Sequence, residues 1–452
     1  GHIRDLPKTS FGIKVDNGKF VPEYRVTKDH SDIAKKIKDL SKKAETIYIA
    51  TDEDREGEAI GYHIAYMLNK GKDIEKYPRI VFHEITKKAI KKAIENPRTL
   101  NIDNVNAQQT RRLLDRIVGY KLSPLLGQKI QRGLSAGRVQ SSALKIIADR
   151  EREIKKFIPI EYWTILGLFK DSEANLIEFN GNKIEKLSIK SKEEANNIVN
   201  SLENLEYKVE NIETKKRKTS APAPFMTSTL QQTASSMLGF SPKRTMQIAQ
   251  KLYEGVKTPI GNMGIITYMR TDSLNIAKEA QNEAIDYIKD NYGDKYLDAK
   301  IFKSKTQNAQ EAHEAIRPTQ IKLNPNDMKN YLNSDEFKLY SLIYNRFIAS
   351  QMKPAEFEIQ NIIISSENGK FKIGGRKLVF DGFYKVYGNK DRDKLLPDSK
   401  IGEKVKLENL KATQHFTEPP SRYSEASLIK ELEKLGIGRP STYAPTISLL
   451  QA

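Results

Sequence analysis

The sequence predicts a multidomain α/β protein in which a β-rich domain is interrupted by a helical module. A β-rich run at residues 46–50 is followed by an acidic turn and by an amphipathic helical pattern at 58–68. Short β-rich runs dominate residues 162–219 and return at 357–409, and the stretch between these two blocks is helical in pattern. At 452 residues the chain should hold about three domains.

The N-terminal part is expected to contain one strand followed mainly by helices. The strand at 46–50 matters because ligand-binding side chains commonly follow the carboxyl ends of strands in α/β sheets. Helices are expected at 58–68, 85–95, 106–117 and 138–156, with turn signals at 96–97, 123–124 and 133–137.

The two β-rich blocks are expected to form one domain that carries the helical module as an insertion. Strands are predicted at 163–169, 359–365 and 404–407, with one helix near 191–202. The module begins after the basic stretch 215–218 and the breaker at 221–224, and it ends near Lys353. The chain would enter the module near Thr219 and leave it near Lys353, and these two connections would let the module hinge as a unit.

Composition limits the classes of function. The chain has 76 Lys and Arg against 58 Asp and Glu, and the resulting charge of +18 favours a polyanionic partner, although a merely solvated basic surface is the competing interpretation. The absence of cysteine excludes disulfides, cysteine-bound zinc and a thiol nucleophile. No apolar run has the length that crosses a bilayer, so we expect no membrane contact and a cytoplasmic protein.

An acidic cluster follows the first predicted strand. Asp52, Asp54 and Glu56 alternate, so an extended backbone would point all three carboxylates to one side, where they could share Mg²⁺. The competing interpretation is an acidic turn that complements the dipole of the following helix.

A second cluster combines a possible nucleophile with a phosphate-binding group. Residues 264–273 predict a short apolar strand that delivers Tyr268 and Arg270 into a polar turn. A tyrosine can attack phosphorus, and an arginine two residues on can bind the phosphate. Most of the 20 tyrosines should be packing residues, so Tyr268 alone would not establish this chemistry.

Several separate stretches together resemble the bacterial type IA DNA topoisomerases, in the topoisomerase I branch. In family order they are residues 1–7, the Toprim motif 51–58, 106–109 with 111–112, 134–141, 224–225 with 227–232, 266–273, 308–318 and 438–443. The resemblance implies a toroidal, multidomain architecture. Its regions would be an α/β Toprim domain (1–100), a helical DNA-groove domain (101–156 with 419–452), a β-rich arch (157–221 with 354–418) and a helical domain carrying the tyrosine (222–353).

The resemblance also implies an activity and the roles of individual residues. Tyr268 would form a transient 5′-phosphotyrosyl link to one DNA strand, with Arg270 positioning the phosphate and His313 hydrogen-bonding it or helping proton transfer. Asp52, Asp54 and Glu56 would bind Mg²⁺. The implied reaction is ATP-independent relaxation of negatively supercoiled DNA, and we expect a monomer. A lone helical histidine is also compatible with a structural role, and Arg317 is a weaker candidate.

The single-stranded DNA groove implied by the resemblance would be lined by matched polar and basic residues. They are His2, Arg79, Arg111, Arg112, Asp115, Tyr120, Ser135, Ala136, Gly137, Arg138, Val139, Gln140 and Arg439. For any one of these arginines, a surface ion pair is the competing interpretation.

The sequence departs from the family pattern at both ends, so we expect it to be truncated. Family members place a strand with a glutamate and a nearby lysine before the stretch matched by residues 1–7, and C-terminal DNA-binding repeats after the helix at 445–452. Two alternatives therefore stay open. One is a catalytically silent fragment that binds single-stranded DNA; the other is a Toprim nuclease or primase, against which the stretches around Tyr268 and 135–140 count.

Overall fold

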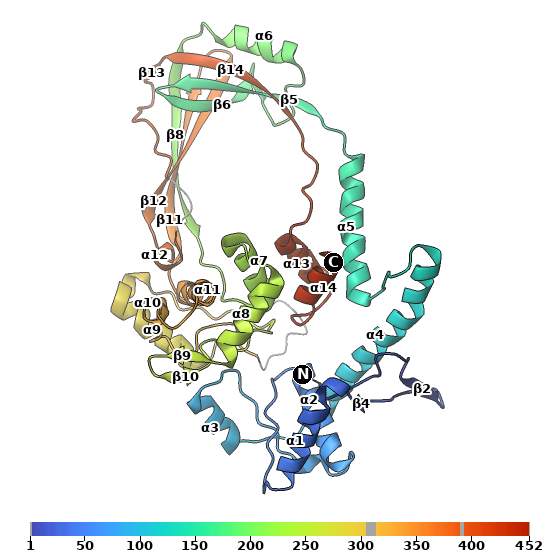
Figure 1. Ribbon diagram of the computed structural model, residues 1–452. Coiled ribbons are helices and arrows are strands. Elements are labelled where there is room, and N and C mark those ends of the chain that lie inside the picture. Colours follow the sequence, from blue (N-terminus) through green and yellow to red (C-terminus); the bar gives the residue numbers. More distant parts are fainter. Residues whose placement is uncertain (1, 304–312, 389–392, 452) are drawn as a thin grey trace.

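The computed structural model describes residues 2–303, 313–388 and 393–451, whose elements are arranged as a ring (Figure 1). The N-terminal region lies at the bottom, the sheet forms an arch at the top, and the helices between them complete the two sides. Gly1 and residues 308–312 of the matched stretches lie outside the described residues. The predicted fold class, with α/β, helical and β-rich regions, is confirmed.

The N-terminal region is built from helices and very short strands. Its elements are β1 (Arg4–Asp5), β2 (Ile13–Asp16), β3 (Lys19–Pro22), β4 (Arg25–Val26), α1 (Ser31–Ser41), α2 (Arg55–Asn69), α3 (Lys87–Glu95) and 3-10 turns at Lys28–His30 and Ile74–Lys76. The strand predicted at 46–50 is reduced to one parallel bridge between Ile49 and Arg79. Ile49 N–H donates to Pro78 O, and Ile49 O accepts from Ile80 N–H. On its other side Arg79 forms a second bridge, antiparallel, with Arg98.

The helical region comprises α4 (Ile102–Lys129), α5 (Arg138–Lys156), α13 (Glu425–Lys434) and α14 (Tyr443–Gln451). A core of Ala143, Leu428, Ile429, Leu432 and Ile447 joins α5 to the C-terminal helices. The turn predicted at 123–124 is wrong, because α4 continues through Pro124 to Lys129. Pro124 is exposed, so water can bond the carbonyl that the proline ring leaves without its helical partner.

The arch is an eight-stranded antiparallel sheet with the order β13-β8-β11-β12-β6-β5-β14, in which β7 pairs with β6. The strands are β5 (Glu161–Phe169), β6 (Ser172–Phe179), β7 (Asn182–Lys183), β8 (Tyr207–Thr219), β11 (Ala355–Ser365), β12 (Gly369–Phe380), β13 (Lys404–Val405) and β14 (Leu407–Phe416). Helix α6 (Lys192–Leu202) packs on the sheet through Ala195, Ile198 and Leu202. Both β-rich blocks therefore form one sheet, as predicted.

The helical module lies between β8 and β11. It contains α7 (Thr227–Leu238), α8 (Pro242–Glu254), β9 (Val256–Thr258), β10 (Gly261–Met263), α9 (Lys278–Tyr292), a 3-10 turn at Asp294–Tyr296, α10 (Pro325–Met328) and α11 (Ser334–Ser350), and it packs against α12 (Tyr384–Tyr387) of the arch. Its hydrophobic core extends past Lys353 to Ala355, Phe357 and Phe383. Phe357 packs in this core, while Ile362 and Ile364 pack in the core of the arch. Side chains alternate between the two faces along a strand, so Phe357 lies on the opposite face of β11 from Ile362 and Ile364. The buried face of β11 therefore changes between residues 357 and 362.

Within the described residues, no helix has the length and apolar content needed to span a bilayer.

Candidate active site

Tyr268 lies where the helical module meets the N-terminal region. The predicted strand is instead an extended segment with one bridge, between Ile266 and Pro318. Its backbone bonds to several distant segments: Gly264 N–H donates to Ile85 O (3.0 Å) and Tyr268 N–H to His83 O (2.8 Å). A Cβ at Gly264 would lie 2.2 Å from Tyr253 O, so only glycine fits this approach.

The Tyr268 hydroxyl donates a hydrogen bond to Asp54 Oδ2 at 2.7 Å. The side chain is buried, and burial together with the negative charges of Asp54 and Asp52 raises the pKa of Tyr268 far above its ordinary value. The phenol is therefore protonated at neutral pH. A reaction at this oxygen needs an acceptor for its proton, and Asp54 is in hydrogen-bond contact with it.

The acidic turn presents its carboxylates differently from the extended arrangement predicted. Helix α2 begins at Arg55, so Glu56 lies in its first turn, while Asp54 is the N-cap and accepts from Gly57 N–H at 2.7 Å. Glu56 Oε2 contacts His2 Nε2 (2.8 Å) and Gln108 Nε2 (3.0 Å). Burial alone would raise the pKa of Glu56, but these two hydrogen bonds, together with the positive charges of His2 and Arg111, lower it.

Asp52 and Asp54 are neighbouring carboxylates of the acidic turn that could hold a cation. Burial and the neighbouring Asp54 charge raise the pKa of Asp52, a repulsion that a bound cation would relieve. Among the residues that the structure describes, no cluster of three or more His, Asp or Glu side chains is arranged to hold a metal. Mg²⁺ commonly uses one or two carboxylates and completes its shell with water and substrate phosphates, which this pair allows.

Arg79 does not line a groove, which corrects its assignment as a DNA-binding residue. Its side chain is fully buried, and its guanidinium donates to Glu58 Oε1 (3.1 Å), Ile80 O (2.7 Å) and Asp52 O (2.7 Å). Glu58 also accepts from Arg98 and from the backbone N–H of Asn101. Arg79 therefore holds the backbone of the acidic turn through the carbonyl of Asp52. The carboxylate of Glu58 compensates the charge of this buried guanidinium.

A small cavity of about 80 Å³ beside Tyr268 collects polar residues from distant parts of the chain. It is lined by Asp54, Arg55, Glu56, Arg111, Arg270, Asp272, His313, Arg439, Pro440 and Ser441. Its four arginines outnumber its three carboxylates, and a guanidinium can bind a phosphate group with two hydrogen bonds, so the cavity suits a phosphate. The sequence interpretation missed Arg55, Asp272 and Ser441, although Arg55 stands inside the acidic motif and Asp272 two residues after Arg270.

His313 lies near Tyr268, but its ring nitrogen makes a hydrogen bond to another residue. Its Nε2 contacts the backbone O of Glu53, and its ring lies edge-on to Tyr268 with the centroids 6.2 Å apart. Arg317 is buried and pairs with Glu314 (2.7 Å) and Glu84 (3.4 Å), which explains it as a structural residue. His313 also lines the small cavity, so it can reach a group bound there.

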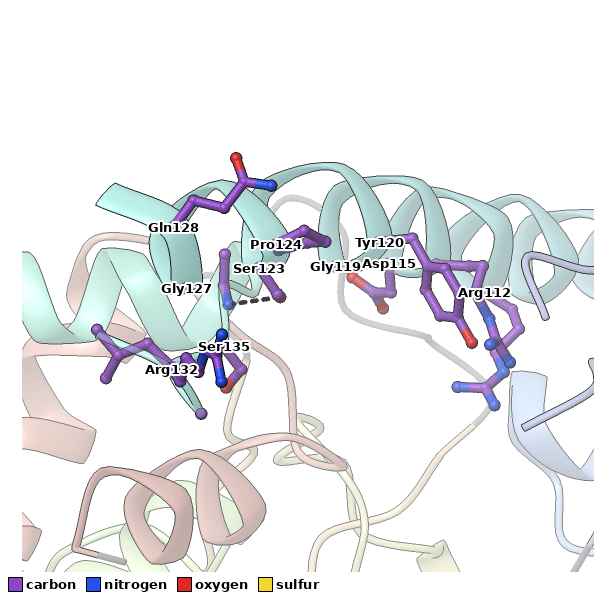
Figure 2. Close-up of a pocket in the computed structure, with 14 residues that line it drawn as sticks. Arg112, Asp115, Gly119, Tyr120, Ser123, Pro124, Gly127, Gln128, Arg132 and Ser135 are labelled. Atoms are coloured by element: carbon purple, nitrogen blue, oxygen red, sulfur yellow. Dashed lines mark hydrogen bonds between the residues drawn. The ribbon is translucent and has the colours of Figure 1, made fainter. Parts of the chain in front are cut away.

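Two larger cavities continue from the small one along α4. The first, of about 450 Å³, shares Glu56, Arg111, Arg270 and Ser441 with the small cavity. The second, of about 940 Å³, shares Arg112 and Asp115 with the first, and it is lined by Tyr120 of α4 and by Ser135 and Ala136 of the loop that precedes α5 (Figure 2). Neighbouring cavities in this series share lining residues, and the series, called here the α4 groove, runs along α4 from the cavity lined by Asp54, the hydrogen-bond partner of Tyr268.

The predicted groove residues are held by specific contacts. Arg112 donates to both carboxylate oxygens of Asp5 (3.0 and 2.6 Å), and Arg138 donates to Asp115 at 2.8 Å. Ala136 N–H donates to Ser123 Oγ at 3.0 Å, which fixes the loop against α4 (Figure 2).

Of the remaining predicted groove residues, His2 and Arg439 line these cavities, whereas none of the three cavities is lined by Gly137, Arg138, Val139 or Gln140. His2 lines the cavity of about 450 Å³, and the exposed Arg439 lines the small one. Gly137 is the N-cap of α5, with Val139 and Gln140 in its first turn. Gln140 Nε2 donates to Ser135 O at 3.2 Å, so these residues shape the loop that enters α5.

The fold and the site together define a ring-shaped, multidomain protein with a buried tyrosine at an acidic turn of the Toprim type. The family profile described as DNA topoisomerase matches residues 99–452, and the profile described as Toprim domain matches residues 1–85. The chain belongs to the DNA topoisomerase family.

Individual relatives agree with this assignment. The chain is 62% identical to DNA topoisomerase 1 of Campylobacter jejuni and 60% identical to that of Helicobacter pylori, in each case over 100% of its own length. It spans 64% and 61% of the lengths of these two relatives. The solved structure of full-length topoisomerase I from Thermotoga maritima superposes with a TM-score of 0.86 at 44% identity, covering 100% of this chain and 73% of that one.

Proposed function

We propose that this chain is the strand-cleaving part of a type IA DNA topoisomerase that relaxes negatively supercoiled DNA without ATP. The observation that carries the proposal is the Tyr268 hydroxyl, hydrogen-bonded to Asp54 at 2.7 Å, beside a cavity lined by arginines at the end of the α4 groove. A single strand lying in this groove would bring one phosphate to Tyr268.

The proposed cleavage is a transesterification. Tyr268 Oη attacks the phosphorus, a tyrosyl O–P bond forms, and the P–O3′ bond breaks to leave a 5′-phosphotyrosyl link and a free 3′-hydroxyl. Asp54 Oδ2 would accept the phenolic proton, the departing 3′ oxygen would take a proton from solvent, and Arg270 would offset the charge that develops on the phosphate oxygens. Resealing reverses these steps. No external energy is required, because one phosphodiester replaces another.

Mg²⁺ is the proposed cofactor, held by Asp52 and Asp54, with Glu56 as the third predicted ligand. When bound, it would neutralise phosphate charge during resealing. In the present geometry Glu56 contacts His2 and Gln108, so it would need to turn towards the other two carboxylates to complete the predicted set.

Strand passage would require the helical module to separate from the rest of the ring. The contacts that would break include the two backbone bonds to His83 and Ile85, the Tyr268–Asp54 bond and the pair Ser228–Glu433 (2.7 Å). These contacts are polar, so each would exchange protein partners for water on opening, at a modest net cost of about 1 kcal/mol per bond. We expect the protein to act as a monomer in the cytoplasm.

The proposal is tested by plasmid relaxation with Mg²⁺ and without ATP, comparing the chain with Tyr268→Phe. Relaxation that is lost in the variant, with single-strand affinity retained, is the expected result. Binding of single-stranded DNA with no relaxation and no covalent product in either protein would favour a silent binding fragment instead.

A further inference from the structure

Thr227 belongs to the matched stretch 227–232, to which the proposed reaction gives no role. It is the first residue of α7, and its side chain is fully buried. A buried hydroxyl needs polar partners inside the protein, because water cannot reach it. The backbone N–H of Thr227 donates to Thr271 O at 2.9 Å, so the start of α7 is joined to the segment that carries Arg270.

The hydroxyl of Thr227 binds the two peptide groups that flank Arg270. Thr227 Oγ1 donates to Met269 O at 2.7 Å and accepts from Thr271 N–H at 2.9 Å. Met269 O belongs to the peptide group before Arg270, and Thr271 N–H belongs to the peptide group after it. The orientations of these two groups define the backbone dihedral angles of Arg270. One side chain therefore restrains both angles, and with them the direction in which the Arg270 side chain leaves the backbone.

The surroundings strengthen this restraint. Met269 and Thr271 are buried, and hydrogen bonds are electrostatically stronger inside a protein than in water. Thr271 Oγ1 in turn accepts from Ser273 N–H at 3.0 Å, so the turn after Arg270 is held as well. Arg270 itself is half-buried and lines the cavities of about 80 and 450 Å³. Its guanidinium ends a long side chain, so a small rotation at the backbone would displace it within these cavities.

We propose that Thr227 is a positioning residue that holds Arg270 towards the phosphate bound in the small cavity. Thr227 does not line this cavity, and it acts only through the backbone on either side of Arg270. The proposal rests on the function proposed above, since Arg270 is the group that offsets the phosphate charge there.

The test removes the hydroxyl in Thr227→Val, which keeps the shape of the side chain, and retains it in Thr227→Ser. Thr245→Val is the matched control, because Thr245 is also fully buried in the helical module and its hydroxyl donates to Ser241 O at 3.0 Å, beside the start of α8. Three quantities are measured: the unfolding midpoint, the single-turnover rate of adduct formation, and the salt dependence of the dissociation constant for a single-stranded oligonucleotide.

Thr227→Val should slow adduct formation by about 10²-fold, the effect of misplacing a group by roughly 1 Å. It should also reduce the slope of log affinity against log salt by about 1, the effect of losing one phosphate contact. Thr227→Ser and Thr245→Val should change neither the rate nor the slope. Wild-type rate and slope in Thr227→Val, or the same losses in Thr245→Val, would overturn the proposal. If Thr227→Val does not fold, Thr227→Ala is measured in its place.

Arg270→Ala separates positioning from a general loss of structure. In the Arg270→Ala background, Thr227→Val should not reduce the salt slope further, because the group that it positions is absent. An equal further reduction in that background would overturn the proposal. The slope also distinguishes this proposal from the proposed reaction. If Thr227→Val lowers the slope only when Arg270 is present and no protein forms an adduct, the reaction is refuted and the positioning role stands.

Discussion

Replacing Gly57 with alanine should displace the acidic turn from Tyr268. A Cβ at Gly57 would lie 1.9 Å from the carbonyl oxygen of Asp52 and 2.8 Å from its carbonyl carbon, both backbone atoms. The same oxygen accepts from the buried guanidinium of Arg79 at 2.7 Å, so it cannot move away without breaking that bond. Overpacking of this kind costs about 1–3 kcal/mol, and the backbone must shift to relieve it.

Gly127→Ala is the matched control, because Gly127 is also helical and a Cβ there meets nothing within 4 Å. Alanine in an open helical position should stabilise by about 0.5–1 kcal/mol. Thermal unfolding and the single-turnover rate of covalent adduct formation are measured for both variants. Gly57→Ala should lower the unfolding midpoint and the adduct rate. Gly127→Ala, in the wall of the cavity of about 940 Å³, should raise the midpoint and leave the adduct rate at saturating oligonucleotide unchanged. Equal midpoints and rates for the two variants would refute the idea that this close approach positions Asp52 and Asp54.

Three further predictions follow from single side chains. Asp54→Asn should slow adduct formation by roughly 10²–10⁴-fold in single-turnover cleavage, because the amide cannot accept the Tyr268 proton, and it should leave oligonucleotide affinity intact; an unchanged rate would remove Asp54 as the acceptor. Arg79→Met should lower the free energy of unfolding in denaturant by about 3–5 kcal/mol, because Glu58 would lose its buried partner. The salt dependence of oligonucleotide binding should stay the same, whereas loss of a phosphate contact would reduce it. Burial, with the positive charge of Arg4, lowers the pKa of His63 from 6.5 to about 4. The unfolded chain therefore binds more protons than the folded one between pH 6.5 and pH 4, and the free energy of unfolding should fall by up to about 3 kcal/mol over this range. A His63→Gln variant should lose this component, and a pH profile identical to that of the wild type would contradict it.

Elements with strong local periodicity were predictable from the sequence. Helix α5 has the bounds that its apolar spacing predicts, and the β-rich blocks on both sides of the helical module form one sheet. These signals lie within short windows, so they do not depend on distant partners.

Features set by distant partners were not predictable. Residues 46–50 and 264–269 look like strands, but their backbone groups bond separate segments such as 78–80, 83–85 and 317–319 instead of a continuous ladder. Arg79 looks like a groove residue because it is basic, yet its place is decided by Glu58 and the Asp52 carbonyl, which only the fold brings to it. The alternation of Asp52, Asp54 and Glu56 predicted that all three carboxylates face one side. In the structure α2 begins at Arg55, so Glu56 has helical backbone geometry and the alternation of an extended chain does not apply to it.

The covalent link to Tyr268 is the most direct test of the proposed chemistry. The chain is incubated with single-stranded oligonucleotides labelled at either end, stopped with denaturant, digested with protease and analysed by mass spectrometry. The account predicts a nucleotide bound through its 5′ phosphate to the peptide that contains Tyr268, and no such product from Tyr268→Phe. A link through the 3′ phosphate, or an adduct that persists in Tyr268→Phe, would contradict it.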